Sequence, residues 1–296
     1  MRLGVHVSIE GGILEALERA KQLSCSTMQI FSRSPRGGHA SPLPKKDLRR
    51  FYAGRLEAGI DPLVVHGPYI INLASPTRRT WSFSAARYRE EYHRCHALSA
   101  AYLVTHVGSH RGAGEEVGIK RVADAINRTL GSLASSVMIV LENTAGSGQG
   151  LGYAFEQLAA MREQVSDNAR VGICLDTAHL FASGFAIHTE EGLEETLTQF
   201  DRLIGMEHLK VIHLNDSKVA FKSRVDRHWH IGEGRIGLEA MARIVNHPRL
   251  KHLPFILETP KDTPKDDPRN LATVRKLVAD VEGPPQQERS RHVRTA

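Results

Sequence analysis

The stretch VGICLDTAH (Val171–His179) shows the pattern that decides the fold, because a short apolar, β-rich run ends on an ionisable residue, Asp176. Similar runs recur along the chain, and longer stretches with helical periodicity separate them. The expected strands are Leu3–His6, Thr27–Phe31, Leu63–His66, Tyr102–His106, Met138–Glu142, Val171–Asp176, Leu209–Asn215 and Phe255–Glu258. The expected helices include Ile13–Gln22, Lys46–Ala58, Val117–Leu133, Phe155–Val165 and Glu190–Leu203.

This alternation of strands and helices predicts parallel strand pairing with right-handed crossovers. Eight such units in about 260 residues match the size of a (β/α)₈ TIM barrel, and a doubly wound open sheet is the structural alternative. Since no internal repeat or linker interrupts the pattern, we expect residues 1–282 to form a single TIM-barrel domain. The polar residues 283–296 are expected to be a disordered basic tail.

The composition favours a globular protein with an anionic partner. Of the 296 residues, 41% are hydrophobic, which is enough for a sizeable core, and Lys plus Arg outnumber Asp plus Glu by 39 to 33. The resulting net charge is +6, but residues 283–296 hold three Arg and one Glu and so account for +2 of it. The remaining excess is modest and would favour a partner such as nucleic acid.

Cysteine usage and hydropathy argue against a disulfide-rich secreted protein and against a membrane protein. Cys25, Cys95 and Cys174 are an odd number without CxxC spacing, which argues against a disulfide framework and fits a reducing compartment. The N-terminus MRLGVHVSIEGG has no apolar signal core, and no run of about 18 apolar residues follows. A cytoplasmic protein without membrane association is the expectation.

Metal-type ligands stand at the ends of six of the eight expected strands. The carboxyl ends of barrel strands converge on one face, so these side chains would meet there. Burying so many ionisable groups together without a cation would carry a heavy desolvation cost. We therefore predict metal binding by His66, His106, Glu142, Asp176, His213 and Glu258.

Two further patterns add residues of the same kind. In LDTAH, Asp176 and His179 are three residues apart, so a turn after the strand could place both near the site. In VDRHWH, Asp226 and His228 alternate and would share one side of an extended segment. The predicted set is then nine ligands, with five imidazoles and four carboxylates.

Several separated motifs together resemble endonuclease IV, the trinuclear zinc apurinic/apyrimidinic endonuclease family. The similarity extends from HVSIEGG near the start to ILETP near the end, and agreement over so many segments is more specific than one short motif. The other matching segments are HGPYIINLASP (66–76), THVGSH (105–110), LENTAGSG (141–148), CLDTAH (174–179), HLNDSK (213–218) and SRVDRHWHIGEGRIG (223–237).

The resemblance implies three Zn²⁺ per chain. The first would be held by His66, His106 and Glu142, and the second by Asp176, His213 and Glu258 with Glu142 bridging the two. The third would be held by His179, Asp226 and His228. Mixed imidazole and carboxylate ligands also suit Mn²⁺ at one site. Three dications against four carboxylates leave a charge of about +2, which attracts a phosphodiester. His6, Asn143, Asn215 and His110 lie in the matching motifs and could orient the ligands.

The implied activity is a hydrolase of the deoxyribonuclease IV type, acting on double-stranded DNA with abasic sites. It would cut the phosphodiester 5′ to the abasic site, leave a 3′-hydroxyl and a 5′-deoxyribose phosphate, and act in base excision repair as a monomer. Cleaning of blocked 3′ termini is a related activity. We expect Glu142 and Glu258 to be the catalytic carboxylates, with Glu142 bridging two cations and Glu258 orienting the attacking hydroxide.

A Gly/Pro/Ser-rich loop, SRSPRGGHASP, carries Arg33 and Arg36, which could contact phosphates. The resemblance implies that this loop enters the duplex where a base is missing, with Arg36 at the inserted position and Tyr69 as a second DNA contact. The chain departs from the family pattern at Gly37 and Gly38, where an aromatic residue often follows the arginine, and this puts a stiff wedge in doubt. Ala186 also replaces the usual acidic residue, without expected consequence because it is not a ligand.

Two other functions remain open from the sequence. A divalent-metal sugar isomerase can use the same barrel, because a fold does not define a chemistry. Such sites are dominated by carboxylates around two metals, and need neither the third group of His179, Asp226 and His228 nor a basic loop. A DNA-binding protein without catalysis would need only Lys and Arg, so the predicted metal ligands argue against it.

Overall fold

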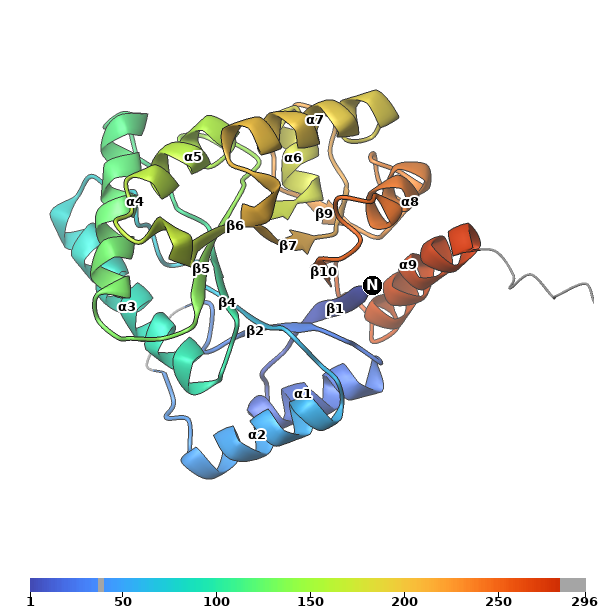
Figure 1. The fold of residues 1–296 in the computed structure, drawn as a ribbon, viewed down its shortest axis with the longest axis horizontal. Helices are drawn as coiled ribbons and strands as arrows, with labels where there is room; N and C mark the ends of the chain where they lie inside the picture. The colour runs from blue at the N-terminus through green and yellow to red at the C-terminus, as the bar shows by residue number, and fades with distance from the viewer. Residues whose placement is uncertain (37–39, 283–296) are drawn as a thin grey trace, which may run out of the picture.

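The computed structural model describes residues 1–36 and 40–282, and within them eight parallel strands close into a barrel (Figure 1). Their order around the barrel is β1-β10-β7-β6-β5-β4-β3-β2, so that β1 pairs with both β2 and β10. The bounds are β1 (Arg2–Val7), β2 (Met28–Phe31), β3 (Leu63–His66), β4 (Tyr102–Thr105), β5 (Met138–Glu142), β6 (Val171–Asp176), β7 (Leu209–His213) and β10 (Pro254–Leu257). This confirms the predicted (β/α)₈ TIM barrel and excludes the open sheet.

Helices surround the barrel, and two of them, α1 and α7, have the predicted bounds. The other predicted helices differ only at their ends, which is where helices fray. The bounds are α1 (Ile13–Gln22), α2 (Lys45–Glu57), α3 (Arg78–Ala97), α4 (Glu115–Leu130), α5 (Phe155–Glu163), α6 (Thr177–Ser183), α7 (Glu190–Leu203), α8 (Leu238–Asn246) and α9 (Asp266–Glu282), with short 3₁₀ turns at Asn168–Arg170 and Met206–His208.

An apolar layer inside the barrel explains why the strand ends carry the site. Six buried side chains from neighbouring strands pack into this layer: Val64, Val104, Val140, Cys174, Val211 and Ile256. Side chains two residues apart on a strand point to the same face, so the residue two positions after each also points inward, above the apolar layer. Those residues are His66, His106, Glu142, Asp176, His213 and Glu258. The barrel therefore holds six ionisable side chains next to a buried layer of apolar side chains.

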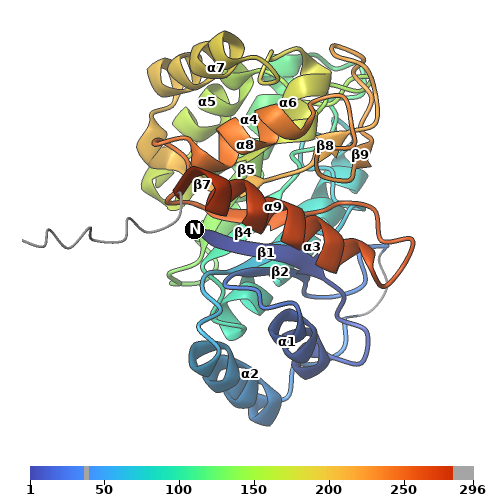
Figure 2. The ribbon, with the colours of Figure 1, turned by 90° about the vertical axis from the view of Figure 1, so that its right-hand side faces the viewer.

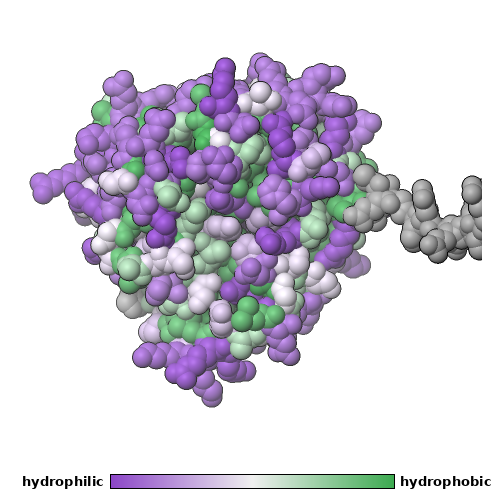
Figure 3. All heavy atoms as spheres, viewed as in Figure 1, coloured by the Kyte–Doolittle hydropathy of each residue, from purple (hydrophilic) through white to green (hydrophobic). Residues whose placement is uncertain are grey.

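A two-stranded antiparallel sheet of β8 (Asp216–Ser217) and β9 (His228–Trp229) lies at the end of the barrel opposite the N-terminus, and α9 runs alongside β1 (Figure 2). On the face shown in Figure 3, hydrophilic residues dominate the rim over the outer helices, and paler residues gather towards the centre. Hydrophilic residues are expected over the outer helices, because each helix packs its apolar side on the barrel and exposes its polar side.

Two sequence predictions concern residues outside the described ranges, namely the basic tail at 283–296 and the loop residues Gly37 and Gly38. Among the helices of the described ranges, none combines the length and the apolar character needed to cross a bilayer.

Candidate metal centre

The nine predicted ligands come together at the carboxyl ends of the barrel strands. Within each of three groups, the possible ligand atoms lie within 4.8 Å of one another. The groups are His66, His106 and Glu142; then Glu142, Asp176, His213 and Glu258; then Asp176, His179 and His228. Asp226, the ninth predicted ligand, lies beside the third group, with its two oxygens 3.2 Å from Nε2 of His179 and 3.4 Å from Nε2 of His228.

Glu142 is fully buried and faces two of these groups through different oxygen atoms. Its Oε2 lies 3.2 Å from Nε2 of His66 and 3.3 Å from Nε2 of His106. Its Oε1 lies 2.9 Å from Nδ1 of His213. This is the geometry of a carboxylate that can bridge two cations.

Three imidazoles are aimed into the site by backbone carbonyl groups. Nδ1 of His66 lies 2.7 Å from the oxygen of Gly67, and Nδ1 of His179 lies 3.0 Å from that of Asn143. Nδ1 of His228 lies 3.1 Å from the carbonyl oxygen of Glu258. A carbonyl only accepts, so each Nδ1 carries the proton and each Nε2 presents a lone pair to the site.

Nε2 of His179 and Nε2 of His228 are buried and have no hydrogen-bond partner among the described residues. Buried polar atoms without partners are rare and call for an explanation such as an ion. Backbone-anchored imidazoles beside carboxylates are also the usual donors to protein-bound zinc. The residues present therefore fit a group of divalent cations.

Two asparagines predicted from the motifs hold the carboxylate ligands in place. Nδ2 of Asn215 donates to Oδ2 of Asp176 over 2.6 Å, and its Oδ1 accepts from the backbone nitrogen of Glu258 over 2.8 Å. Oδ1 of Asn143 accepts from the backbone nitrogen of Asp176 over 2.6 Å. His110 instead accepts from the backbone nitrogen of Gly114, in the loop before α4, and thus helps to shape that loop.

Asp176 also begins α6, which the sequence analysis predicted only as a turn. Its Oδ1 accepts from the backbone nitrogen of His179 over 2.8 Å, as an N-cap residue does. This bond folds the chain back over the end of β6. His179 is thereby brought to the same site as the strand residue that caps its helix.

The sheet that carries His228 is held by a buried carboxylate, Asp216 on β8. Asp216 accepts hydrogen bonds from the backbone nitrogens of Gly232 and Gly234, both at 3.0 Å, and of Ile236 at 2.9 Å. A Cβ atom at Gly234 would lie 2.4 Å from Oδ1 of Asp216, so this close approach requires glycine. The loop after β9 is therefore fixed against β8, next to the site.

The imidazoles and carboxylates shift one another's pKa. Burial alone would raise the pKa of Glu142, but His106 and His213 hold it well below its usual range. Partial burial opposes ionisation of Asp226, but the imidazole of His179, whose Nε2 lies 3.2 Å from Oδ2, lowers the pKa of that carboxyl to about 2. Both carboxylates therefore stay ionised, Glu142 in a fully buried position and Asp226 in an exposed one, as a site for cations requires.

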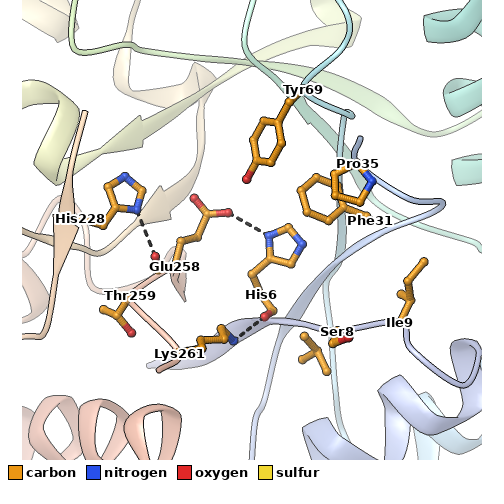
Figure 4. A pocket seen from close by; sticks show the side chains of 11 residues that line it. His6, Ser8, Ile9, Phe31, Pro35, Tyr69, His228, Glu258, Thr259 and Lys261 are labelled. Atoms are coloured by element: carbon orange, nitrogen blue, oxygen red, sulfur yellow. Dashed lines mark hydrogen bonds and ion pairs between the residues drawn. The ribbon is translucent and has the colours of Figure 1, made fainter. Parts of the chain in front are cut away.

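A cavity of about 420 Å³ opens beside Glu258 (Figure 4). Phe31, Pro35 and Tyr69 form its apolar wall. The ring of Tyr69 lies 5.4 Å from that of Phe31, and the residue is 67% exposed, so one of its faces is open to a ligand. The tyrosine hydroxyl points towards Glu258 in Figure 4.

The loop after β2 places its two predicted arginines differently. Arg36 is exposed, and its neighbour Pro35 lines the cavity. Arg33 is buried and forms ion pairs with Glu90, at 3.0 Å, and with Glu91. The suggestion that Arg33 contacts phosphates is therefore wrong, because its side chain anchors the base of the loop to α3.

Gln29 contacts two of the predicted ligands, His213 and Glu258, and the sequence analysis did not identify it. The available signal was an amide side chain within an otherwise apolar strand, MQIF. Such a residue is usually buried only when it has hydrogen-bond partners, and its partners on β7 and just after β10 are distant in sequence.

Comparisons with known proteins show which family this chain resembles. Residues 17–282 match the family model described as a xylose isomerase-like TIM barrel. A protein of Methanosphaerula palustris named "Probable endonuclease 4" is 47% identical over 281 residues, covering 94% of this chain and 98% of that protein. The crystal structure of endonuclease IV from Thermus thermophilus matches with a TM-score of 0.84 and 35% identity, over 94% of this chain and 99% of that chain.

The same barrel occurs in a D-tagatose 3-epimerase-like protein, with a TM-score of 0.67 over 94% of this chain and 97% of that one, but only 18% identity, so this likeness shows the fold alone. The relatives of higher identity cover nearly the full length and confirm the resemblance that the separated motifs indicate. This chain belongs to the endonuclease IV family.

Proposed function

We propose that this protein is a metal-dependent endonuclease of DNA repair, which hydrolyses the phosphodiester 5′ to an abasic site in double-stranded DNA. The products would be a 3′-hydroxyl and a 5′-deoxyribose phosphate, and blocked 3′ termini would be related substrates. The observation that carries this proposal is the convergence of five imidazoles and four carboxylates at the barrel mouth of a chain in this family.

The cations of this proposal are three Zn²⁺ per chain, with Mn²⁺ an alternative at one site. The first is assigned to His66, His106 and Glu142, the second to Asp176, His213 and Glu258 with bridging Glu142, and the third to His179, Asp226 and His228. When bound, such cations neutralise the phosphate and lower the pKa of a water molecule towards about 7.

Glu258 is the residue that we assign to orienting the attacking water. Its carboxylate borders the cavity, and its Oε1 is held by Nδ1 of His6 over 2.9 Å (Figure 4). Its Oε2 lies 3.2 Å from Nδ1 of His213. A carboxylate fixed in this way can accept a hydrogen bond from a water in the cavity and direct the water's lone pair at phosphorus.

Selectivity for abasic DNA is assigned to the exposed residues around the cavity. Tyr69 offers a ring face, and Arg36 lies on the loop whose Pro35 lines the same cavity. Opening a duplex costs least where the base is already lost, so a loop that enters the helix favours such positions. A sugar isomerase on the same barrel would have no use for the third ligand group or for Arg36.

Incision of a defined duplex tests this function directly. We expect the protein to cut a duplex with one abasic site 5′ to that site, and to leave the same duplex with an intact base uncut. Incubation with a chelator should abolish incision, and added Zn²⁺ should restore it. Incision that is insensitive to chelation, or that is equal on both duplexes, would contradict the proposal.

Replacing Arg36 with Ala should raise the KM for an abasic duplex about tenfold, because one phosphate contact is lost. The metal content should stay unchanged, since Arg36 is not among the ligands. Arg202→Ala is the matched control. Arg202 is also exposed, but it stands in the last turn of α7, which leads to the start of β7 and not to the carboxyl ends of the strands. Equal KM values for both variants would show that the loop has no part in binding.

A further inference from the structure

Gln29 on β2 connects two residues assigned to the same cation. It is fully buried, and its Oε1 lies 2.8 Å from Nε2 of His213. Its Nε2 lies 2.6 Å from Oε1 of Glu258. These two partners stand on β7 and at the end of β10, so one amide joins three strands of the barrel at the level of the ligands.

The partners leave the amide only one favourable orientation. The carboxylate of Glu258 can only accept, so the NH₂ of Gln29 must face it, and the carbonyl of Gln29 then faces His213. A carbonyl cannot donate, which means that the proton of His213 resides on Nε2. The lone pair of His213 is therefore on Nδ1, which lies 2.9 Å from Glu142 and 3.2 Å from Glu258.

The same contact fixes the orientation of Glu258. Its Oε1 lies 2.6 Å from Nε2 of Gln29 and 2.9 Å from Nδ1 of His6, and these two nitrogens lie 2.9 Å from each other. Since this network holds Oε1 through the NH₂ group of Gln29, the other oxygen of Glu258 faces Nδ1 of His213, on the side of the candidate ligands. One buried amide thus directs both a nitrogen lone pair and a carboxylate oxygen at the same place.

We propose that Gln29 is a positioning residue for the second cation site, which sets the tautomer of His213 and the orientation of Glu258. This inference rests on the proposed function, because it requires that these two residues bind a cation. Residues that orient metal ligands in this way typically contribute about 10- to 100-fold to metal affinity or activity.

A neighbouring buried residue on the same segment supplies a matched control. Thr27, two positions earlier and also fully buried, satisfies its hydroxyl with the backbone oxygen of Pro62 over 2.7 Å. Thr27→Val therefore removes a buried hydrogen bond without touching a ligand. Gln29→Met removes the amide at nearly constant volume, so the two variants separate a general loss of packing from an effect on the site.

The test compares cation affinities in the full-length protein loaded with Co²⁺, measured by competition with a chelator. In Gln29→Met, we expect one of three Co²⁺ ions to bind about 10- to 100-fold more weakly, with a changed visible absorption, while the other two keep their affinity. In Thr27→Val, all three ions should bind as in the native protein. Gln29→Asn keeps an amide that is too short to reach both partners, and should weaken the same ion.

If Gln29→Met binds all three Co²⁺ ions with the affinities of the native protein, Gln29 is not a positioning residue. An equal loss in Thr27→Val would lead to the same conclusion, because it would show that any disturbance of β2 releases the ion. If Gln29→Met does not fold, native affinities in Gln29→Asn would decide against the proposal. Failure of the native protein to bind Co²⁺ at all would instead refute the proposed function, so the two failures are distinguishable.

Discussion

Replacing Glu258 with Gln should lower the rate of incision at an abasic site by about 10²- to 10⁴-fold, which is the usual contribution of a group that directs proton transfer. The substitution preserves shape and removes the negative charge that accepts hydrogen bonds from His6 and Gln29. The amide can no longer orient a water as a carboxylate does. Single-turnover incision of a labelled abasic duplex measures the change.

DNA affinity is the internal control for this variant, because Arg36 and Tyr69 lie outside the substituted position. Binding of the uncleaved duplex should remain within about threefold of the native value, which corresponds to less than 1 kcal/mol. Since Glu258 is also an assigned ligand, cation content is measured in the same preparation. Incision at a native rate would remove Glu258 from the catalytic role.

Replacing Glu142 with Gln should have the largest effect on cation content, because each of its two oxygens faces a different ligand group. We expect bound transition metal to fall from three ions per chain to one. A neutral amide donates through one end and accepts weakly through the other, so it cannot bridge two cations as a carboxylate does. Elemental analysis of the purified variant gives the number.

Asp226→Asn provides the comparison, because the Asp226 carboxylate pairs with His179 and His228, both of the third group. It should cost at most one ion per chain. We therefore expect Glu142→Gln to lose more bound metal per chain than Asp226→Asn. A smaller loss in Glu142→Gln than in Asp226→Asn would contradict the assignment of Glu142 as the bridge between two sites.

The barrel and the gathering of the candidate ligands at its mouth were predictable because both follow from local patterns. Six of the eight expected strands carry, at or near their ends, an inward-facing candidate ligand two positions after an apolar residue, as in Val64 and His66 or Val140 and Glu142. The period of two along a strand fixes which side chains share a face, whatever the details of packing. The closure of the sheet then brings the strand ends together.

Other features depend on partners that are distant in sequence and could not be predicted in this way. Gln29 forms its contacts with His213 on β7 and with Glu258 just after β10. Asp216 accepts hydrogen bonds from backbone nitrogens of the loop after β9. Arg33 was expected to face DNA because it lies in a basic loop, but it pairs with Glu90 and Glu91 on α3. Position in a loop indicates little about whether a long side chain turns inward.

The central claim is that three cations are held by nine side chains at the mouth of the barrel. Counting metal ions per chain in purified protein that incises abasic DNA tests this claim most directly. Three transition-metal ions per chain, predominantly zinc, is the predicted result. Fully active protein without bound metal would contradict the account.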